Sequence, residues 1–130
     1  MTGPLVLDTW AFVEELRDGP HRADLDARRK GASRVVTTGQ ALVESYTFIL
    51  RTTKRPSMAR EWWDLVREGR LVVLEPSLDE VDRVLAEVPR GVGFSLVDAS
   101  VAWAARHERV AEVATGDREF LLLGLQPLFA

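Results

Sequence analysis

Short apolar runs alternate with longer helical stretches along this 130-residue chain, and this alternation constrains the fold more than any other feature. Strands that are buried on both faces of a parallel sheet read as such continuous apolar runs. The runs are Pro4–Leu7, Arg34–Thr37, Arg70–Leu74 and Val110–Thr115. This order of elements predicts an α/β fold, a three-layer α/β/α sandwich around an open, mainly parallel central sheet.

Helical stretches follow the predicted strands. They cover Trp10–Arg17, His21–Lys30, Gln40–Thr52, Pro56–Gly69, Leu78–Val88, Ser95–His107 and Arg118–Leu123. The sequence from Ser77 to Glu80 is typical of a capping box at a helix start. The helix that follows is predicted to bury Leu78, Val81, Val84, Leu85 and Val88. A last short strand over Gly124–Phe129 is expected at an edge of the sheet, because Pro127 cannot donate a ladder hydrogen bond.

The composition indicates one globular domain over residues 1–130, with 46% hydrophobic and 28% charged residues. The chain has no cysteine, which excludes a disulfide scaffold and a thiolate metal site. No apolar run approaches the ~20 residues of a membrane span, and the start, Met1–Pro4, lacks the basic segment of a signal peptide. We therefore expect a cytoplasmic protein that does not bind a membrane.

The net charge of −3, from 17 basic and 20 acidic residues, does not favour a protein that coats nucleic acid through charge alone. A nucleic-acid site remains compatible with this charge if acidic residues gather at a metal and basic residues lie elsewhere. One basic cluster could contact phosphates, or could be a charged loop at a helix C-terminus. Its members are Arg51, Lys54, Arg55 and Arg60.

Asp98 lies within a helix that is apolar nearly all round, from Phe94 to Ala105. Helical spacing places it on one stripe with Val101 and Ala102, so we expect a buried carboxylate. Such a group needs a hydrogen-bond donor, a cation or a metal to offset the loss of water. The alternative is local, because Ser95 and Asp98 have the spacing of a capping box.

Three further carboxylates lie in comparable positions. Asp8 ends the first apolar run, Asp117 follows the last one, and Glu44 lies at the edge of the apolar face of its helix. Each has a simpler interpretation: Asp8 and Asp117 as helix N-caps, and Glu44 as a surface glutamate. Ligands of open parallel sheets bind beyond the carboxyl ends of the strands, where Asp8 and Asp117 should lie. We therefore expect the four carboxylates to converge.

Four carboxylates in one place repel one another and take up protons unless cations neutralise them. Oxygen ligands favour Mg²⁺ or Mn²⁺ over zinc, which prefers nitrogen and sulfur. Mg²⁺ combines protein carboxylates with substrate phosphate, and metal ions can activate the water that hydrolyses a phosphodiester. The pattern thus predicts a metal-dependent phosphodiesterase site.

The motifs that carry these acids resemble the PIN domain family of ribonucleases, and within it the VapC-like toxin branch of toxin–antitoxin pairs. They are Val6–Thr9, Ala41–Glu44, Ser95–Ala99 and Thr115–Phe120, the last followed by Gly124–Leu125. The resemblance implies Asp8, Glu44, Asp98 and Asp117 as catalytic and metal-binding residues for Mg²⁺ or Mn²⁺, with Thr9 and Thr115 in support. It further implies RNA as the substrate, a homodimer and a cognate antitoxin protein.

Two other functions are open alternatives, and two are disfavoured by the residues present. A PIN protein can process RNA without an antitoxin, and the fold can act as a non-catalytic interaction module. A receiver domain is disfavoured, because the third predicted strand ends in Glu75-Pro76 and no lysine follows Lys54. An Asp-x-Asp phosphatase is disfavoured, because Asp8-Thr9-Trp10 lacks the second aspartate.

The adjacent Trp62 and Trp63 point about 100° apart on their helix. Packing of both on the core is favoured over a position of one of them against a partner. We also expect their helix to lie near a partner surface.

Overall fold

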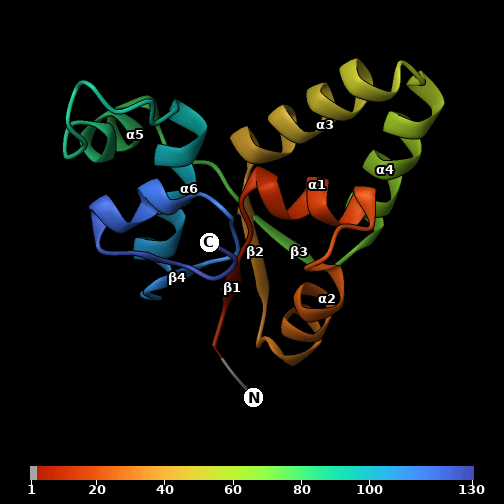
Figure 1. The fold of residues 1–130 in the computed structure, drawn as a ribbon, viewed down its shortest axis with the longest axis horizontal. Helices are drawn as coiled ribbons and strands as arrows, with labels where there is room; N and C mark the ends of the chain where they lie inside the picture. The colour runs from red at the N-terminus through yellow and green to blue at the C-terminus, as the bar shows by residue number, and fades with distance from the viewer. Residues whose placement is uncertain (1–2) are drawn as a thin grey trace.

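The computed structural model describes residues 3–130, so Met1 and Thr2, on which part of the signal-peptide expectation rests, lie outside the described residues. The helices are α1 (Thr9–Arg17), α2 (Arg22–Gly31), α3 (Gly39–Thr53), α4 (Pro56–Glu68), α5 (Leu78–Leu85), α6 (Leu96–His107) and the 3₁₀ helix η1 (Arg118–Leu123). The strands are β1 (Leu5–Val6), β2 (Val35–Thr38), β3 (Leu71–Leu74), β4 (Glu112–Val113) and β5 (Gln126–Pro127). Figure 1 shows their arrangement.

All strand pairs of the sheet are parallel. Strands β1, β2 and β3 form one ladder, in which β2 is central. Strands β4 and β5 form a second ladder. A parallel bridge between Leu7 and Ala114 joins the two ladders, and the Ala114 amide donates to the Val6 carbonyl at 2.8 Å. The resulting order, β3-β2-β1-β4-β5, places Pro127 on an edge strand, as predicted.

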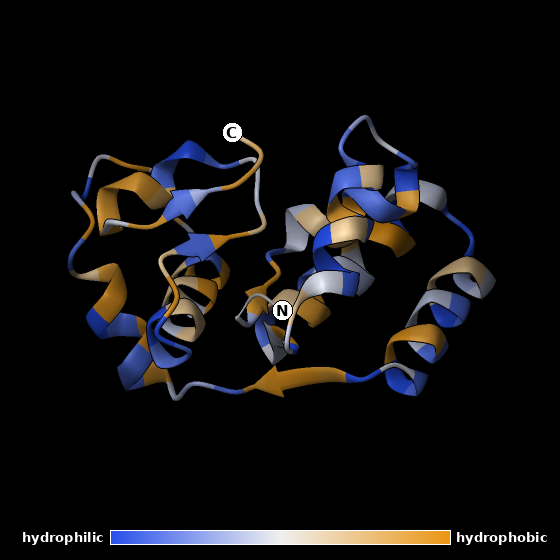
Figure 2. Ribbon diagram, turned by 90° about the horizontal axis from the view of Figure 1, so that it is seen from below, coloured by the Kyte–Doolittle hydropathy of each residue, from blue (hydrophilic) through white to orange (hydrophobic). Residues whose placement is uncertain are grey.

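Successive residues of the strands belong to opposite faces of the sheet, and each face has its own core. Val6 and Val36 pack with α5, α6 and η1 in one core. Leu5, Leu7 and Val35 pack with α1, α2 and α4 in the other. Figure 2 shows β3 as hydrophobic along its length, but this edge strand is only partly covered, and its Val73 is exposed. The three-layer α/β/α sandwich is thus confirmed.

Helix α6 packs closely on the sheet because its buried side chains are small. They are Ala99, Ser100, Ala102, Ala104 and Ala105, together with Val101. The central part of the helix is buried nearly all round, as expected: from Ala99 to Ala105 only Trp103 is partly exposed, because α3 and α5 pack against α6 in addition to the sheet. The exposed residues lie at the two ends of the helix, and they are Leu96, Arg106 and His107.

Helix α5 differs from its prediction at both ends. Leu78 is 80% exposed, because the apolar stripe that includes Val81 and Val84 continues one turn beyond the core that covers it. The helix ends at Leu85, but Val88 is still buried in the turn that follows.

Trp62 and Trp63 on α4 both pack against the core formed with α1 and α2. Trp62 meets Phe12 edge to face at 5.7 Å between ring centroids, and Trp63 meets Tyr46 at 6.4 Å. Core packing is therefore correct for both, and the partner surface stays a prediction. Within residues 3–130, no helix is long and apolar enough to cross a membrane.

Candidate active site

Asp8 lies between β1 and α1, and the residue is 4% exposed. Its Oδ1 accepts the Thr9 amide at 2.8 Å, so Asp8 is the N-cap of α1. The interpretation of Asp8 as a helix cap is therefore correct. Its Oδ2 accepts the Thr115 hydroxyl at 2.8 Å. Because the Asp8 amide also donates to the Ala114 carbonyl at 3.3 Å, adjacent parallel strand ends hold this carboxylate in place.

Asp117 follows β4 and caps η1, with its Oδ1 accepting the Glu119 amide at 2.9 Å. Its own amide donates to the Thr115 hydroxyl oxygen at 3.1 Å. The Thr115 side chain therefore bridges Asp8 and Asp117. Asp8 and Asp117 are 109 positions apart in the sequence, and the Thr115 hydroxyl fixes their relative positions in the structure.

Asp98 completes the capping box of α6. Its Oδ2 accepts the Ser95 amide, and its amide donates to the Ser95 hydroxyl oxygen, both at 3.0 Å. The carboxylate is half-buried, so the expectation of a fully buried group on an apolar stripe is wrong. In the first turn the side chain points toward the helix N-terminus, where the backbone donors and solvent lie. Among residues 3–130, no hydrogen bond uses Asp98 Oδ1.

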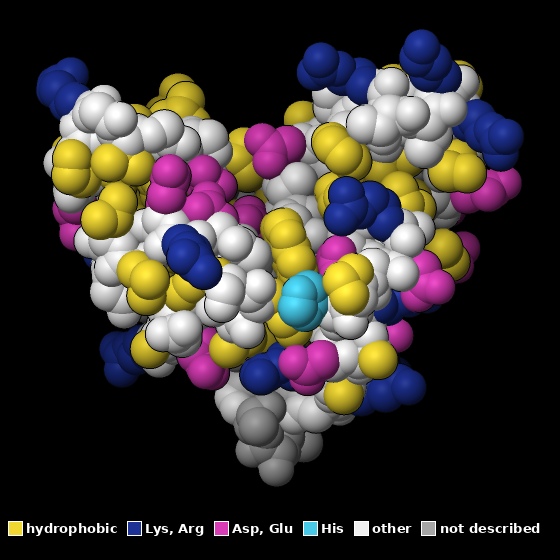
Figure 3. Space-filling model, in the orientation of Figure 1, with side chains coloured by type: hydrophobic (Ala, Val, Ile, Leu, Met, Phe, Trp, Pro, Cys, Tyr) yellow, Lys and Arg dark blue, Asp and Glu magenta, His cyan; other side chains and the backbone are white. Residues whose placement is uncertain are grey.

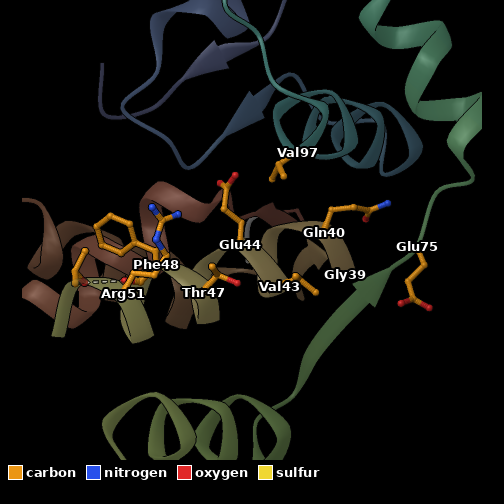
Figure 4. A pocket seen from close by; sticks show the side chains of 10 residues that line it. Gly39, Gln40, Val43, Glu44, Thr47, Phe48, Arg51, Glu75 and Val97 are labelled. Carbon is orange, nitrogen blue, oxygen red and sulfur yellow. Dashed lines mark hydrogen bonds between the residues drawn. The ribbon is translucent and has the colours of Figure 1, made fainter. Parts of the chain in front are cut away.

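Glu44 is exposed on α3 and lines an open cleft of about 1060 Å³. Figure 4 shows its carboxylate extending from α3 toward Val97, the residue before Asp98. Figure 3 shows a notch on this side of the molecule with acidic side chains beside it. A surface position is thus correct for Glu44, but that surface belongs to the cleft.

The two threonines expected in support behave differently. The Thr115 hydroxyl donates a hydrogen bond directly to the Asp8 carboxylate. The Thr9 hydroxyl instead donates to the Ala41 carbonyl at 3.4 Å and so connects α1 to α3.

A second hydroxyl pair was not foreseen from the sequence: Thr38 and Ser100 share a hydrogen bond of 2.9 Å. Thr38 ends β2 and caps α3, which carries Glu44, and Ser100 belongs to α6, which carries Asp98. Their hydrogen bond therefore links the two helices. Ser100 is the one other polar residue within the apolar stretch after Asp98, and that could have signalled a buried polar partner.

The acids influence one another electrostatically. The pKa of Asp8 is raised to about 7, chiefly by burial and also by the negative charges of Asp98 and Glu44, against the lowering effect of the hydrogen bonds from Thr115 and Thr9. Burial also raises the pKa of Asp98, reinforced by Asp117 and Glu44 and opposed by the hydrogen bonds from Ser95. The four predicted carboxylates therefore share one electrostatic environment, supplied by four different elements.

The donor set suits a hard divalent cation. It consists of carboxylate and hydroxyl oxygens, and within residues 3–130 none of the four acids forms an ion pair with Lys, Arg or His. The acids do not form a closed cage, since in the described part of the chain no three acidic, His or Cys side chains lie close enough to hold an ion. The site therefore offers separate oxygen ligands at the edge of an open cleft.

The model of the PIN domain family matches residues 5–124, a range that includes all four acids. This chain belongs to the PIN domain family. The family predicted from the motifs around Asp8, Glu44, Asp98 and Asp117 is thus confirmed. A comparison with curated protein sequences finds no match.

Solved structures from three organisms share this fold. VapC20 of Mycobacterium tuberculosis, described as a sarcin-ricin loop cleaving toxin, has a TM-score of 0.75 at 15% identity, covering 95% of this chain and 96% of its own. VapBC2 of Rickettsia felis, bound to a promoter DNA fragment, has a TM-score of 0.69 at 17% identity, covering 97% and 96%. PAE2754 of Pyrobaculum aerophilum has a TM-score of 0.64 at 24% identity, covering 96% and 80%.

Proposed function

We propose that this chain is a metal-dependent endoribonuclease that hydrolyses RNA phosphodiester bonds and serves as the toxin of a toxin–antitoxin pair. The observation that supports the nuclease is that Asp8, Glu44, Asp98 and Asp117 share one electrostatic environment in a PIN fold, with Glu44 lining an open cleft. The toxin role is supported by the fold shared with VapC20 and VapBC2.

The four acids would hold Mg²⁺ or Mn²⁺ through their oxygens, and such a bound ion activates water and stabilises the leaving oxygen. Asp8 would hold the ion through a carboxylate that the Thr115 hydroxyl and the Thr9 amide keep in place. Asp98 would hold it through a carboxylate that also accepts the Ser95 amide. Glu44 would contribute from the cleft wall.

The partners follow from this proposal. The substrate is RNA, the regulator is an antitoxin protein, the site of action is the cytoplasm, and the assembly is a homodimer. The Trp62/Trp63 helix is the surface that we expect near a partner. Protection of its amides from hydrogen exchange on antitoxin binding supports this, and unchanged exchange contradicts it.

The test is cleavage of a panel of structured and single-stranded RNAs with Mg²⁺ or Mn²⁺, with chelator and Asp98→Asn as controls. Asp98→Asn keeps an oxygen for the Ser95 amide but loses the negative charge, so we expect a rate at least ~100-fold lower. Glu80→Gln is the matched control, because Glu80 occupies the same capping-box position in α5.

Cutting that needs metal and survives in Glu80→Gln but not in Asp98→Asn supports the nuclease. Cutting that persists in Asp98→Asn indicates a contaminating ribonuclease and contradicts the site. A protein that folds but neither binds metal nor cuts any RNA is a non-catalytic interaction module. Metal-dependent cutting by a protein that no antitoxin inhibits indicates an RNA-processing enzyme.

A further inference from the structure

The cleft beside Glu44 continues along one side of α3 toward the end of that helix. Gln40, Glu44, Thr47 and Arg51 all line it, at spacings of four, three and four residues that place them on one helix face. Val97 of α6 lines the opposite side at the inner end. Figure 4 shows the Glu44 carboxylate and the Arg51 guanidinium rising from the same side of α3.

Arg51 is the only basic residue that lines this cleft in the described part of the chain. It is exposed and forms no ion pair with any of residues 3–130. Other arginines are already paired with carboxylates, namely Arg17, Arg22, Arg28, Arg29, Arg34 and Arg106. The Arg51 guanidinium is therefore available to an anion that enters the cleft.

We propose that Arg51 binds a backbone phosphate of the RNA, so that α3 forms the wall along which the substrate strand approaches Glu44. This inference rests on the proposed nuclease function. Seven residues separate Glu44 and Arg51, or about 10 Å along the helix axis, so the phosphate held by Arg51 is a neighbour of the scissile one. A planar guanidinium can bind phosphate through two parallel hydrogen bonds.

The charge pattern of the cleft explains why such a residue is needed. The inner end is acidic, and without a bound cation it repels RNA. A positive group set back along the wall attracts the strand without neutralising the carboxylates that would hold the metal. A phosphate contact fixes the register of the strand and reads no base, so Arg51 contributes equally to different sequences.

A purely structural role for Arg51 is the alternative, because it lies in the last turn of α3, where a positive charge favours the helix. Such a role predicts a lower unfolding temperature for Arg51→Gln with unchanged RNA binding. A phosphate contact predicts the reverse. The two roles are therefore separable in one variant.

The experiment compares Arg51→Gln, Arg51→Lys and Arg60→Gln in metal-dependent cleavage of a single-stranded RNA. Arg60 is the matched control, since it is exposed on α4, does not line the cleft and has no ion pair within residues 3–130. For Arg51→Gln we expect KM to rise roughly tenfold with kcat nearly unchanged, from the loss of one charge-assisted hydrogen-bonded contact. Arg51→Lys should restore most of the affinity, and Arg60→Gln should match the unaltered protein.

Binding is measured separately, by fluorescence anisotropy of the labelled RNA on Asp98→Asn protein over a range of salt concentrations. Loss of one phosphate contact should reduce the slope of log affinity against log salt by about 0.7 for a single strand. An unchanged KM and slope in Arg51→Gln, or equal effects in Arg60→Gln, overturn the inference while the nuclease stands. If the unaltered protein cuts nothing, the proposed function fails, and the anisotropy series still decides whether Arg51 contacts RNA.

Discussion

Helices α5 and α6 begin with the same capping box, but the two boxes have opposite electrostatic character. In α5, Glu80 accepts the Ser77 amide at 3.0 Å in open solvent, and this hydrogen bond lowers the pKa of Glu80. In α6, Asp98 accepts the Ser95 amide at the same distance, yet burial and the neighbouring acids Asp117 and Glu44 raise its pKa. A local motif therefore explains the helix start in both cases, and only the surroundings identify the acid available for chemistry.

The largest expected difference between the acids around Asp98, which include Asp8, and the start of α5 is the pH dependence of stability without metal. The pKa of folded Asp8 is about 7 against an ordinary 3.8, so its contribution to the free energy of unfolding falls as pH rises from about 4 to 7. The full shift corresponds to about 4 kcal/mol. Glu80 has the opposite sign, because a lowered pKa gives stability that is lost as pH falls.

Urea unfolding in chelator at several pH values measures this difference. Asp8→Asn should be more stable than the unaltered protein above pH 7 and should lose most of the slope between pH 4 and 7. Glu80→Gln should keep that slope. A stability that rises steadily from pH 4 to 7, unaffected by Asp8→Asn, contradicts the electrostatic description of the site.

A smaller effect is expected from Thr115→Val, which removes the hydroxyl that Asp8 and the Asp117 amide share. Valine keeps the shape of this fully buried residue, so the loss is confined to the hydrogen bonds and amounts to about 1–3 kcal/mol. Because the Thr115 bond lowers the pKa of Asp8, that pKa should rise further, and cleavage should fall most at low pH.

The matched control for this change is Thr53→Val. Thr53 does not line the cleft, and its hydroxyl donates to the Ile49 carbonyl and accepts the Arg55 amide, so it also serves two partners. Equal losses of cleavage in the two variants would show that Thr115 does not act through the acids.

The sequence was sufficient for the layers of the fold and for the positions of Asp8 and Asp117 after strands, because both depend on strong local signals. Continuous apolar runs indicate strands buried on both faces, and Asp8 and Asp117 follow such runs directly. The sequence could not reveal the Thr115 bridge or the Thr38–Ser100 bond, since both join residues that are close only after the strands pair. The prediction that Leu78 is buried was wrong, because helical spacing shows which residues share an apolar face but not how far the core extends along that face.

The most direct test of the central claim is calorimetric titration of Mn²⁺ into the unaltered protein, Asp98→Asn and Glu80→Gln at pH 8. We predict that the unaltered protein and Glu80→Gln bind Mn²⁺ alike, whereas Asp98→Asn binds at least ~10-fold more weakly. Equal binding by all three proteins would contradict the account, because it would place the metal away from the acid that burial and like charges single out.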